Sequence, residues 1–271
     1  MEINEKTQVL IEMLPYIKKY HNKTVVIKFG GNAMSEVNNV VEDIVLLKHI
    51  GIKPIVVHGG GPDIDSELRK ISREPKFVNG LRYTDEATIK IAQQVFGRIN
   101  EGIVGSINSH GAKSIDVSGC IKARQKSGEL GLVGDITGID KKKISKLIAS
   151  GIIPVISPLG VSNDGKVYNL NADTAAAHIA VAVKAEKLTI LTNVDGVMIK
   201  NNLAPHINFT TARDEIKNGE ISKGMIPKVE ACIYAVKNKC PKAHLINGLI
   251  PHSLLLEIFT DKGIGTEFVY R

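Results

Sequence analysis

Residues 24–65 read TVVIKFGGNAMSEVNNVVEDIVLLKHIGIKPIVVHGGGPDID, and this stretch decides the fold. Two short runs rich in β-branched residues, at 25–27 and 55–57, predict buried strands. A glycine cluster follows each run, and residues 37–50 between them place apolar side chains at helical spacing. This order predicts a βαβ unit in which both glycine turns lie at the carboxyl ends of parallel strands.

The residues at this edge of the sheet favour an anionic ligand. In open parallel sheets, ligands bind outside the carboxyl ends of the strands. Glycines allow backbone N–H groups to approach a ligand closely, and a helix N-terminus adds partial positive charge. Lys28 lies two residues before the first glycine pair, so its ammonium group could reach the same edge. The simpler interpretation, in which each glycine cluster is only a tight turn, stays open at this point.

Composition and charge narrow the functional classes. The chain has 271 residues, of which 43% are hydrophobic and 23% charged, as expected of a globular protein. It lacks an apolar run of the roughly 20 residues needed to span a bilayer and lacks a secretory signal, so we expect a cytoplasmic protein without a membrane partner. The net charge of +7 comes from scattered lysines, and aromatic residues make up only 4% of the chain, so a nucleic-acid partner is not expected. The cysteines lack metal-ligand spacing.

Strand and helix patterns alternate along the whole chain, which indicates the α/β class with a mainly parallel sheet. We expect one domain of two lobes that meet near residues 173–185. Residues 1–21 predict a helix divided at Pro15, which serves either packing or an oligomer contact. Residues 119–130 are expected to be irregular, and Thr84 is expected to cap the following helix.

Four polar residues outside the βαβ unit are candidates for the same site. Arg82 follows a predicted hairpin turn, and its forked guanidinium could bind a carboxylate. Asn169 and Asp173 lead into an apolar helix, in a stretch with more polar groups than one cap needs. Lys228 lies near a helix N-terminus, where the dipole disfavours a cation, so an anion-binding role is favoured.

These side chains suit phosphoryl transfer. The sequence offers no Ser-His-Asp arrangement, no zinc ligand set and no G-x-x-x-x-G-K-[ST] loop. Phosphoryl transfer requires positioning and neutralisation of charge rather than a protein nucleophile. An acceptor carboxylate is already ionised at neutral pH and needs no general base. Lys28 and Lys228 would flank the phosphoryl group, Asp173 would orient them, and Mg²⁺ would shield the other phosphates.

Five motifs, in this order, resemble the acetylglutamate kinase branch of the amino acid kinase family, and the resemblance runs nearly end to end. The motifs are KFGGNAM at 28–34, HGGGP at 58–62, NGLR at 79–82, NLNAD at 169–173 and GMIPK at 224–228. The resemblance implies a three-layer αβα sandwich around a mainly parallel open sheet. It also implies ATP-dependent phosphorylation of the γ-carboxylate of N-acetyl-L-glutamate to N-acetyl-L-glutamyl 5-phosphate, the second step of arginine biosynthesis.

The resemblance further implies roles for individual residues. The catalytic residues would be Lys28, Lys228 and Asp173. The acetylated substrate would be bound by Gly60, Gly61, Arg82 and Asn169, and the transferred phosphate by Gly30 and Gly31. The ATP site would be lined by Asn193, Val194, Asp195, Gly196, Val197, Met198, Glu220, Ile221 and Ser222. No protein ligands to the metal are expected, because Mg²⁺ would bind through the nucleotide phosphates.

Both ends of the chain resemble the arginine-inhibited, hexameric branch of the family. This implies a homo-hexamer built as a trimer of dimers, with residues 1–21 as the oligomerisation helix and L-arginine as inhibitor. The lobes would be residues 22–180 for the amino-acid substrate and residues 181–271 for ATP. The arginine site would include Tyr16, Lys200, His252, Glu257 and Gly263.

Two other functions stay open on the sequence alone. A kinase for a homologous acid such as N-acetylaminoadipate would differ by one methylene in its acceptor, which pockets discriminate by only about 10–200-fold. A non-catalytic arginine-sensing ring would have lost the chemistry, although the intact Lys28, Asp173 and Lys228 argue against it. Asn193 stands where the family usually carries an aspartate.

Overall fold

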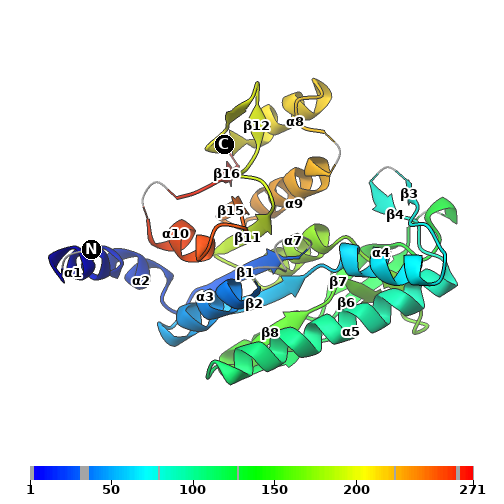
Figure 1. Cartoon of the computed structure of the whole chain (residues 1–271), viewed down its shortest axis with the longest axis horizontal. Helices are drawn as coiled ribbons and strands as arrows, with labels where there is room; N and C mark the ends of the chain where they lie inside the picture. The colour runs from blue at the N-terminus through cyan, green and yellow to red at the C-terminus, as the bar shows by residue number, and fades with distance from the viewer. Residues whose placement is uncertain are drawn as a thin grey trace.

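The computed structural model describes residues 3–30, 37–78, 80–126, 128–222, 224–260 and 263–270, with backbone only for residues 3–6 (Figure 1). Within these ranges the helices are α1 (Ile3–Glu12), α2 (Leu14–Tyr20), α3 (Val37–His49), α4 (Gly61–Lys70), α5 (Glu86–Ser109), α6 (Lys141–Ala149), α7 (Ala172–Ala182), α8 (Phe209–Lys217), α9 (Met225–Lys237) and α10 (Ser253–Phe259). None of them combines the length and apolarity needed to cross a membrane.

An eight-stranded sheet forms the centre of the molecule. Its order is β14-β16-β15-β11-β1-β2-β8-β5, and among the described residues the one antiparallel pairing within it joins β15 to β16. These strands are β14 (His206–Asn208), β16 (Thr266–Val269), β15 (Lys242–Asn247), β11 (Lys187–Thr192), β1 (Thr24–Phe29), β2 (Lys53–His58), β8 (Ile153–Ile156) and β5 (Ser114–Asp116). The predicted βαβ unit, β1–α3–β2, lies in the middle of this sheet, and the mainly parallel open sheet is confirmed.

Helices cover both faces of this sheet. Because side chains alternate along a strand, Val26 of β1 packs with α7 and α9, whereas its neighbours Val25 and Ile27 pack with α3 and α5. The two apolar clusters on either side of the sheet make three layers, as the resemblance implied. Figure 1 shows the same arrangement, with α3 and α5 on one side of β1 and β2 and α7 on the other.

A second sheet has four strands, in the order β10-β9-β6-β7. Its strands are β6 (Ile121–Gln125), β7 (Gly134–Ile139), β9 (Leu159–Val161) and β10 (Val167–Asn169). The expectation that residues 119–130 are irregular is therefore wrong. Ile121 and Ala123 are buried while Lys122 and Arg124 are exposed, which is the period of a half-buried strand.

Two short hairpins complete the fold. The first pairs β3 (Phe77–Val78) with β4 (Leu81–Arg82), and the second pairs β12 (Met198–Ile199) with β13 (Asn202–Leu203). The helix after the first hairpin is capped by Asp85, whose side chain accepts from the Thr88 backbone N–H at 2.8 Å. The prediction that Thr84 caps this helix is wrong, because its buried hydroxyl is turned to the Arg82 carbonyl instead.

The N-terminal segment is divided as predicted. Helix α1 ends at Glu12, and Pro15 occupies the first turn of α2, where a missing backbone N–H costs least. Figure 1 places both helices at one end of the molecule, with α2 beside α10 and α1 farther out. Tyr20 of α2 is buried, whereas Leu10 of α1 is 67% exposed, so α1 presents apolar side chains to the surroundings.

Two glycines with nearly equal φ angles offer a matched test of packing. Gly265 has φ +82°, and a Cβ there would lie 2.1 Å from the Leu245 carbonyl oxygen; Gly219 has φ +81°, with no described atom within 4 Å. We expect Gly219→Ala to lower the free energy of unfolding by about 1–2 kcal/mol, from the left-handed backbone alone. Gly265→Ala should lower the free energy of unfolding by roughly 1–3 kcal/mol more than Gly219→Ala does, because the added methyl group overpacks the site. Urea unfolding measures both losses. Equal losses in the two variants would contradict this packing.

Candidate active site

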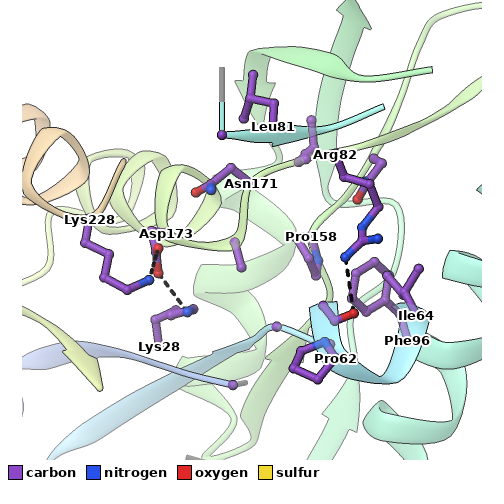
Figure 2. A pocket seen from close by; sticks show the side chains of 18 of the residues that line it. Lys28, Pro62, Ile64, Leu81, Arg82, Phe96, Pro158, Asn171, Asp173 and Lys228 are labelled. Atoms are coloured by element: carbon purple, nitrogen blue, oxygen red, sulfur yellow. Dashed lines mark hydrogen bonds and ion pairs between the residues drawn. The ribbon is translucent and has the colours of Figure 1, made fainter. Parts of the chain in front are cut away.

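A pocket of about 370 Å³ opens at the carboxyl ends of β1 and β2, where the βαβ unit predicted it (Figure 2). It lies beside the N-termini of α4 and α7. Nine of the residues named from the sequence line it together: Lys28, Gly30, Gly60, Gly61, Arg82, Asn169, Asp173, Asn193 and Lys228. The glycine clusters are therefore more than tight turns, because they form one wall of a polar cavity.

Two lysines share one carboxylate in this pocket. Lys28 Nζ lies 2.7 Å from Asp173 Oδ1, and Lys228 Nζ lies 2.9 Å from Asp173 Oδ2. Lys28 lies on the same face of β1 as Val26, which faces α7, and Asp173 lies in the first turn of α7, just after its cap Asn171. Lys228 comes from the first turns of α9, as Figure 2 shows.

The electrostatics of this trio leave a surplus positive charge. Burial alone would raise the pKa of Asp173, but the two ammonium groups outweigh it and lower that pKa to about 2. Burial lowers the pKa of Lys28, and the charge of Lys228 lowers it further, although Asp173 acts in the opposite direction. Two cations around one buried anion leave room for a second anion, and a phosphoryl group would supply it.

The glycine loops approach each other too closely for side chains. A Cβ on Gly30 would lie 2.6 Å from the Gly59 nitrogen, and one on Gly60 would lie 2.7 Å from Ile99 Cδ1. Gly60 is the N-cap of α4, so the free N–H groups of that helix begin at the pocket. Gly31, the other predicted phosphate ligand, lies outside the described residues.

Arg82 and Asn169 each have a protein partner that the sequence did not reveal. Arg82 Nη1 donates to Asp65 Oδ1, and its Nη2 donates to the Gly61 carbonyl oxygen at 3.2 Å. Asn169 Nδ2 donates to Thr84 Oγ1 at 3.1 Å. In the sequence, the one indication that Asp65 lies near the site was its position in the helix that follows the triple glycine.

Most of the predicted nucleotide residues are not among the described residues that line this pocket. Only Asn193 of this set is among the described lining residues of the pocket. Val194, Asp195, Met198, Glu220 and Ser222 have exposed side chains, and Gly196 is buried. The side chains of Val197 and Ile221 belong to the apolar core, so they support the loop rather than face a ligand.

A second, smaller pocket of about 220 Å³ lies between α2, α10 and β15. Of the predicted arginine-site residues, Tyr16, Glu257 and Gly263 line it, together with Lys187 and His244. Glu257 Oε1 lies 2.6 Å from Lys187 Nζ and 2.9 Å from His244 Nε2. Burial raises the pKa of Glu257, but these partners outweigh it and lower that pKa to about 2.

The other two predicted arginine-site residues are not among the described lining residues of this pocket. His252 Nδ1 lies 2.6 Å from Asp43 Oδ1, between the start of α10 and α3. The backbone N–H of Lys200 donates to Glu220 Oε2 at 3.0 Å. His244, which lines the pocket, was not recognised in the sequence because it lies within a buried strand.

A profile of the amino acid kinase family matches residues 23–247. The chain belongs to the amino acid kinase family. It is 51% identical to an acetylglutamate kinase of Thermoanaerobacter pseudethanolicus, in an alignment covering 96% of this chain and 92% of that protein. An acetylglutamate kinase of Methanosphaera stadtmanae is 46% identical, with 96% of both chains covered.

Solved structures agree with this family fold. N-acetylglutamate synthase from Neisseria gonorrhoeae, complexed with coenzyme A and N-acetyl-glutamate, superposes with a TM-score of 0.89 at 27% identity, over 98% of this chain and 63% of that one. Carbamate kinase from Giardia lamblia bound to AMP-PNP superposes with a TM-score of 0.71 at 17% identity, over 92% of this chain and 99% of that one. The second likeness concerns the fold alone.

Removal of the shared carboxylate should destabilise this amino acid kinase in a pH-dependent way. Because the pKa of Asp173 is lowered to about 2 from 3.8, its ionised form stabilises the folded state above about pH 4, and this contribution is lost as the pH falls toward 2. We expect Asp173→Asn to lower the free energy of unfolding by about 3 kcal/mol at pH 7, and by about half as much near pH 3.

The measurement is urea unfolding at both pH values, with Asp214→Asn on the exposed surface of α8 as the control. A loss for Asp173→Asn that is the same at pH 7 and pH 3 would contradict the ion-pair origin of the effect.

Proposed function

We propose that this protein is an ATP-dependent kinase that phosphorylates the γ-carboxylate of N-acetyl-L-glutamate, giving N-acetyl-L-glutamyl 5-phosphate, the second step of arginine biosynthesis. The observation that carries the proposal is that Lys28, which is buried, and Lys228, which is half-buried, share the Asp173 carboxylate within a pocket that also holds Arg82. The acetylglutamate kinases that match nearly the whole chain support the choice of substrate. A reaction that consumes ATP for biosynthesis favours the cytoplasm.

The acceptor would lie between Arg82 and the lysine pair. Arg82 and Asn169 would bind its α-carboxylate and polar groups, and the N–H groups at Gly60 and Gly61 would hold the acidic end. An oxygen of the ionised γ-carboxylate attacks the terminal phosphorus of ATP, and the bond to the bridging oxygen breaks so that ADP leaves. No proton moves in this step, which fits a pocket that offers cations rather than a general base.

Lys28 and Lys228 would stabilise the charge on the moving phosphoryl group. They come from opposite sides of the pocket, from β1 and α9, and Asp173 holds both ammonium groups within 3 Å of its oxygens. The lysine geometry is therefore set before substrate binds, which is the requirement for electrostatic catalysis. Gly30 and Gly31 would add backbone N–H groups to the same phosphate.

ATP would bind over the C-terminal lobe, residues 181–271, with its phosphates directed to the lysines and its other end along the loop of residues 193–198 and residues 220–222. The amino-acid acceptor would bind to residues 22–180. No cluster of three or more His, Cys, Asp or Glu side chains suited to a metal occurs among the described residues. Mg²⁺ would therefore be held through the nucleotide phosphates, where it neutralises their charge.

Acyl-phosphate formation tests this proposal. The native chain with Mg-ATP and N-acetylglutamate should give a product that hydroxylamine traps as a hydroxamate. Lys28→Arg and Asp173→Glu should fold, as measured by circular dichroism, yet lose most turnover, because the phosphoryl position tolerates little displacement. Full activity in either variant would contradict the assigned roles.

The same assay separates the alternatives. Turnover with N-acetylaminoadipate but not with N-acetylglutamate would identify the homologous kinase. Arginine binding without turnover on either acid would identify a non-catalytic sensor.

We also propose that L-arginine inhibits the enzyme by binding in the second pocket, with Tyr16, Glu257 and Gly263 among its ligands. The pocket joins a buried carboxylate to residues of the N-terminal segment, which suits a cationic amino acid. The synthase from N. gonorrhoeae, which has also been solved with coenzyme A and L-arginine, superposes with a TM-score of 0.86 at 27% identity over 98% of this chain and 65% of that one. The exposed apolar residues of α1 support its role as the oligomer contact of a hexamer.

Arginine titration of the hydroxamate assay checks the second pocket. The native enzyme should be inhibited sigmoidally and should sediment as a hexamer. Tyr16→Ala should raise the arginine concentration for half-inhibition by about tenfold through loss of one ligand contact, with turnover in the absence of arginine unchanged. Lys18→Ala, on the exposed side of the same helix, is the control. Arginine-insensitive native enzyme would contradict the proposal.

A further inference from the structure

Arg82 is held on three sides before any substrate binds. Its Nη1 donates to Asp65 Oδ1, and its Nη2 donates to the Gly61 carbonyl oxygen at 3.2 Å. Its guanidinium carbon lies 4.8 Å from the centre of the Phe77 ring. Only 8% of the Arg82 side chain is exposed, so its direction is set by these neighbours and not by solvent.

Asp65 lies behind the pocket rather than in it. Gly61, Phe77 and Arg82 are among the residues that line the cavity, whereas Asp65 is not. Asp65 is four residues after Gly61 in α4, so it stands one helical turn behind the glycine loop and faces the hairpin that carries Arg82. Figure 2 shows Arg82 extending from this hairpin toward the first turn of α4.

We propose that Asp65 is a positioning residue for the acceptor: it orients the Arg82 guanidinium so that the fork meets the carboxylate of the bound substrate. Asp65 acts through Arg82 and does not touch the substrate. This inference rests on the proposed function, in which Arg82 binds the acceptor.

The physical basis is the conformational freedom of arginine. An unrestrained arginine side chain samples many rotamers. A ligand that orders this side chain binds more weakly, because the lost conformational entropy opposes binding. The guanidinium has five N–H donors in a fixed plane. The contacts to Asp65 and Gly61 use two of them and set the orientation of that plane, which leaves as many as three donors for a bound carboxylate.

Asp65 also makes the burial of the guanidinium tolerable. A buried cation without a partner is costly, and the Asp65 carboxylate supplies the counter-charge. The role of Asp65 is thus distinct from that of Asp173, which holds the lysines at the phosphoryl end of the pocket.

Two substitutions at Asp65 separate orientation from charge. Asp65→Ala removes the anchor, whereas Asp65→Asn keeps an oxygen that accepts from Nη1 but removes the charge. Asp63→Ala is the matched control, because Asp63 is an exposed acid in the first turn of the same helix. For each variant, KM and kcat are measured against N-acetylglutamate and against ATP, and the urea midpoint is recorded.

We expect Asp65→Ala to raise KM for N-acetylglutamate by about 10- to 100-fold, the worth of one charged hydrogen bond, with kcat and KM for ATP unchanged. Its urea midpoint should be lower than that of the native chain, because the buried guanidinium loses its counter-charge. Asp65→Asn should restore most of the affinity, and Asp63→Ala should behave as the native enzyme. An unchanged KM in Asp65→Ala would overturn the proposal. Losses of kcat and of affinity for ATP as large as the loss of affinity for N-acetylglutamate would also overturn it, since that pattern marks a residue that only supports the fold.

A second readout requires no turnover. Phenylglyoxal modifies arginine side chains, and peptide mass analysis reports the rate at Arg82. Release of the guanidinium in Asp65→Ala should increase this rate several-fold over the native chain and Asp63→Ala. Equal rates would overturn the positioning role. Failure of the native chain to form acyl phosphate would instead overturn the proposed function, so the two failures are distinguishable.

Discussion

The sharing of one buried carboxylate by two ammonium groups, one buried and one half-buried, is the constraint on which this structure depends. Asp173 contacts both Lys28 and Lys228, and the group carries one positive charge more than it can neutralise. Such a surplus is expensive in an apolar interior, so the pocket is suited to an anion rather than to a neutral ligand. The glycine loops around it provide N–H groups and no side chains, which adds to the same preference.

The parallel sheet brings these groups together. Lys28 lies near the end of a central strand, and Asp173 and Lys228 lie near the starts of α7 and α9. All three meet at the carboxyl edge of the sheet. Successive side chains of a strand point to opposite faces of the sheet, and this places the two charged pockets on opposite sides of it. Lys187 is paired in register with Val25, on the opposite face of the sheet from Lys28, and it meets Glu257 there.

The two ends of the main pocket are built in the same way. At one end a buried aspartate holds two lysines, and at the other Asp65 holds Arg82. In each case an acid sets the direction of a flexible cation before a substrate arrives. Long cationic side chains are useful for binding phosphate and carboxylate, but their rotamer entropy must be removed in advance if the geometry is to be exact enough for chemistry.

The sequence by itself determined the βαβ unit, the position of the glycine loops and the identity of the main pocket residues Lys28, Arg82, Asp173 and Lys228. These follow from local periodicity, turn chemistry and motif order, which depend on neighbours along the chain. Only the tertiary structure decided that Asp65 holds Arg82 and that Tyr16 and Glu257 share a pocket from which Lys200 and His252 are absent. Only the tertiary structure showed that residues 121–125 form a strand and that Asp85 caps α5. The physical reason is that such contacts depend on strand order and on which face of each element is buried, and neither quantity is a property of a short stretch of sequence.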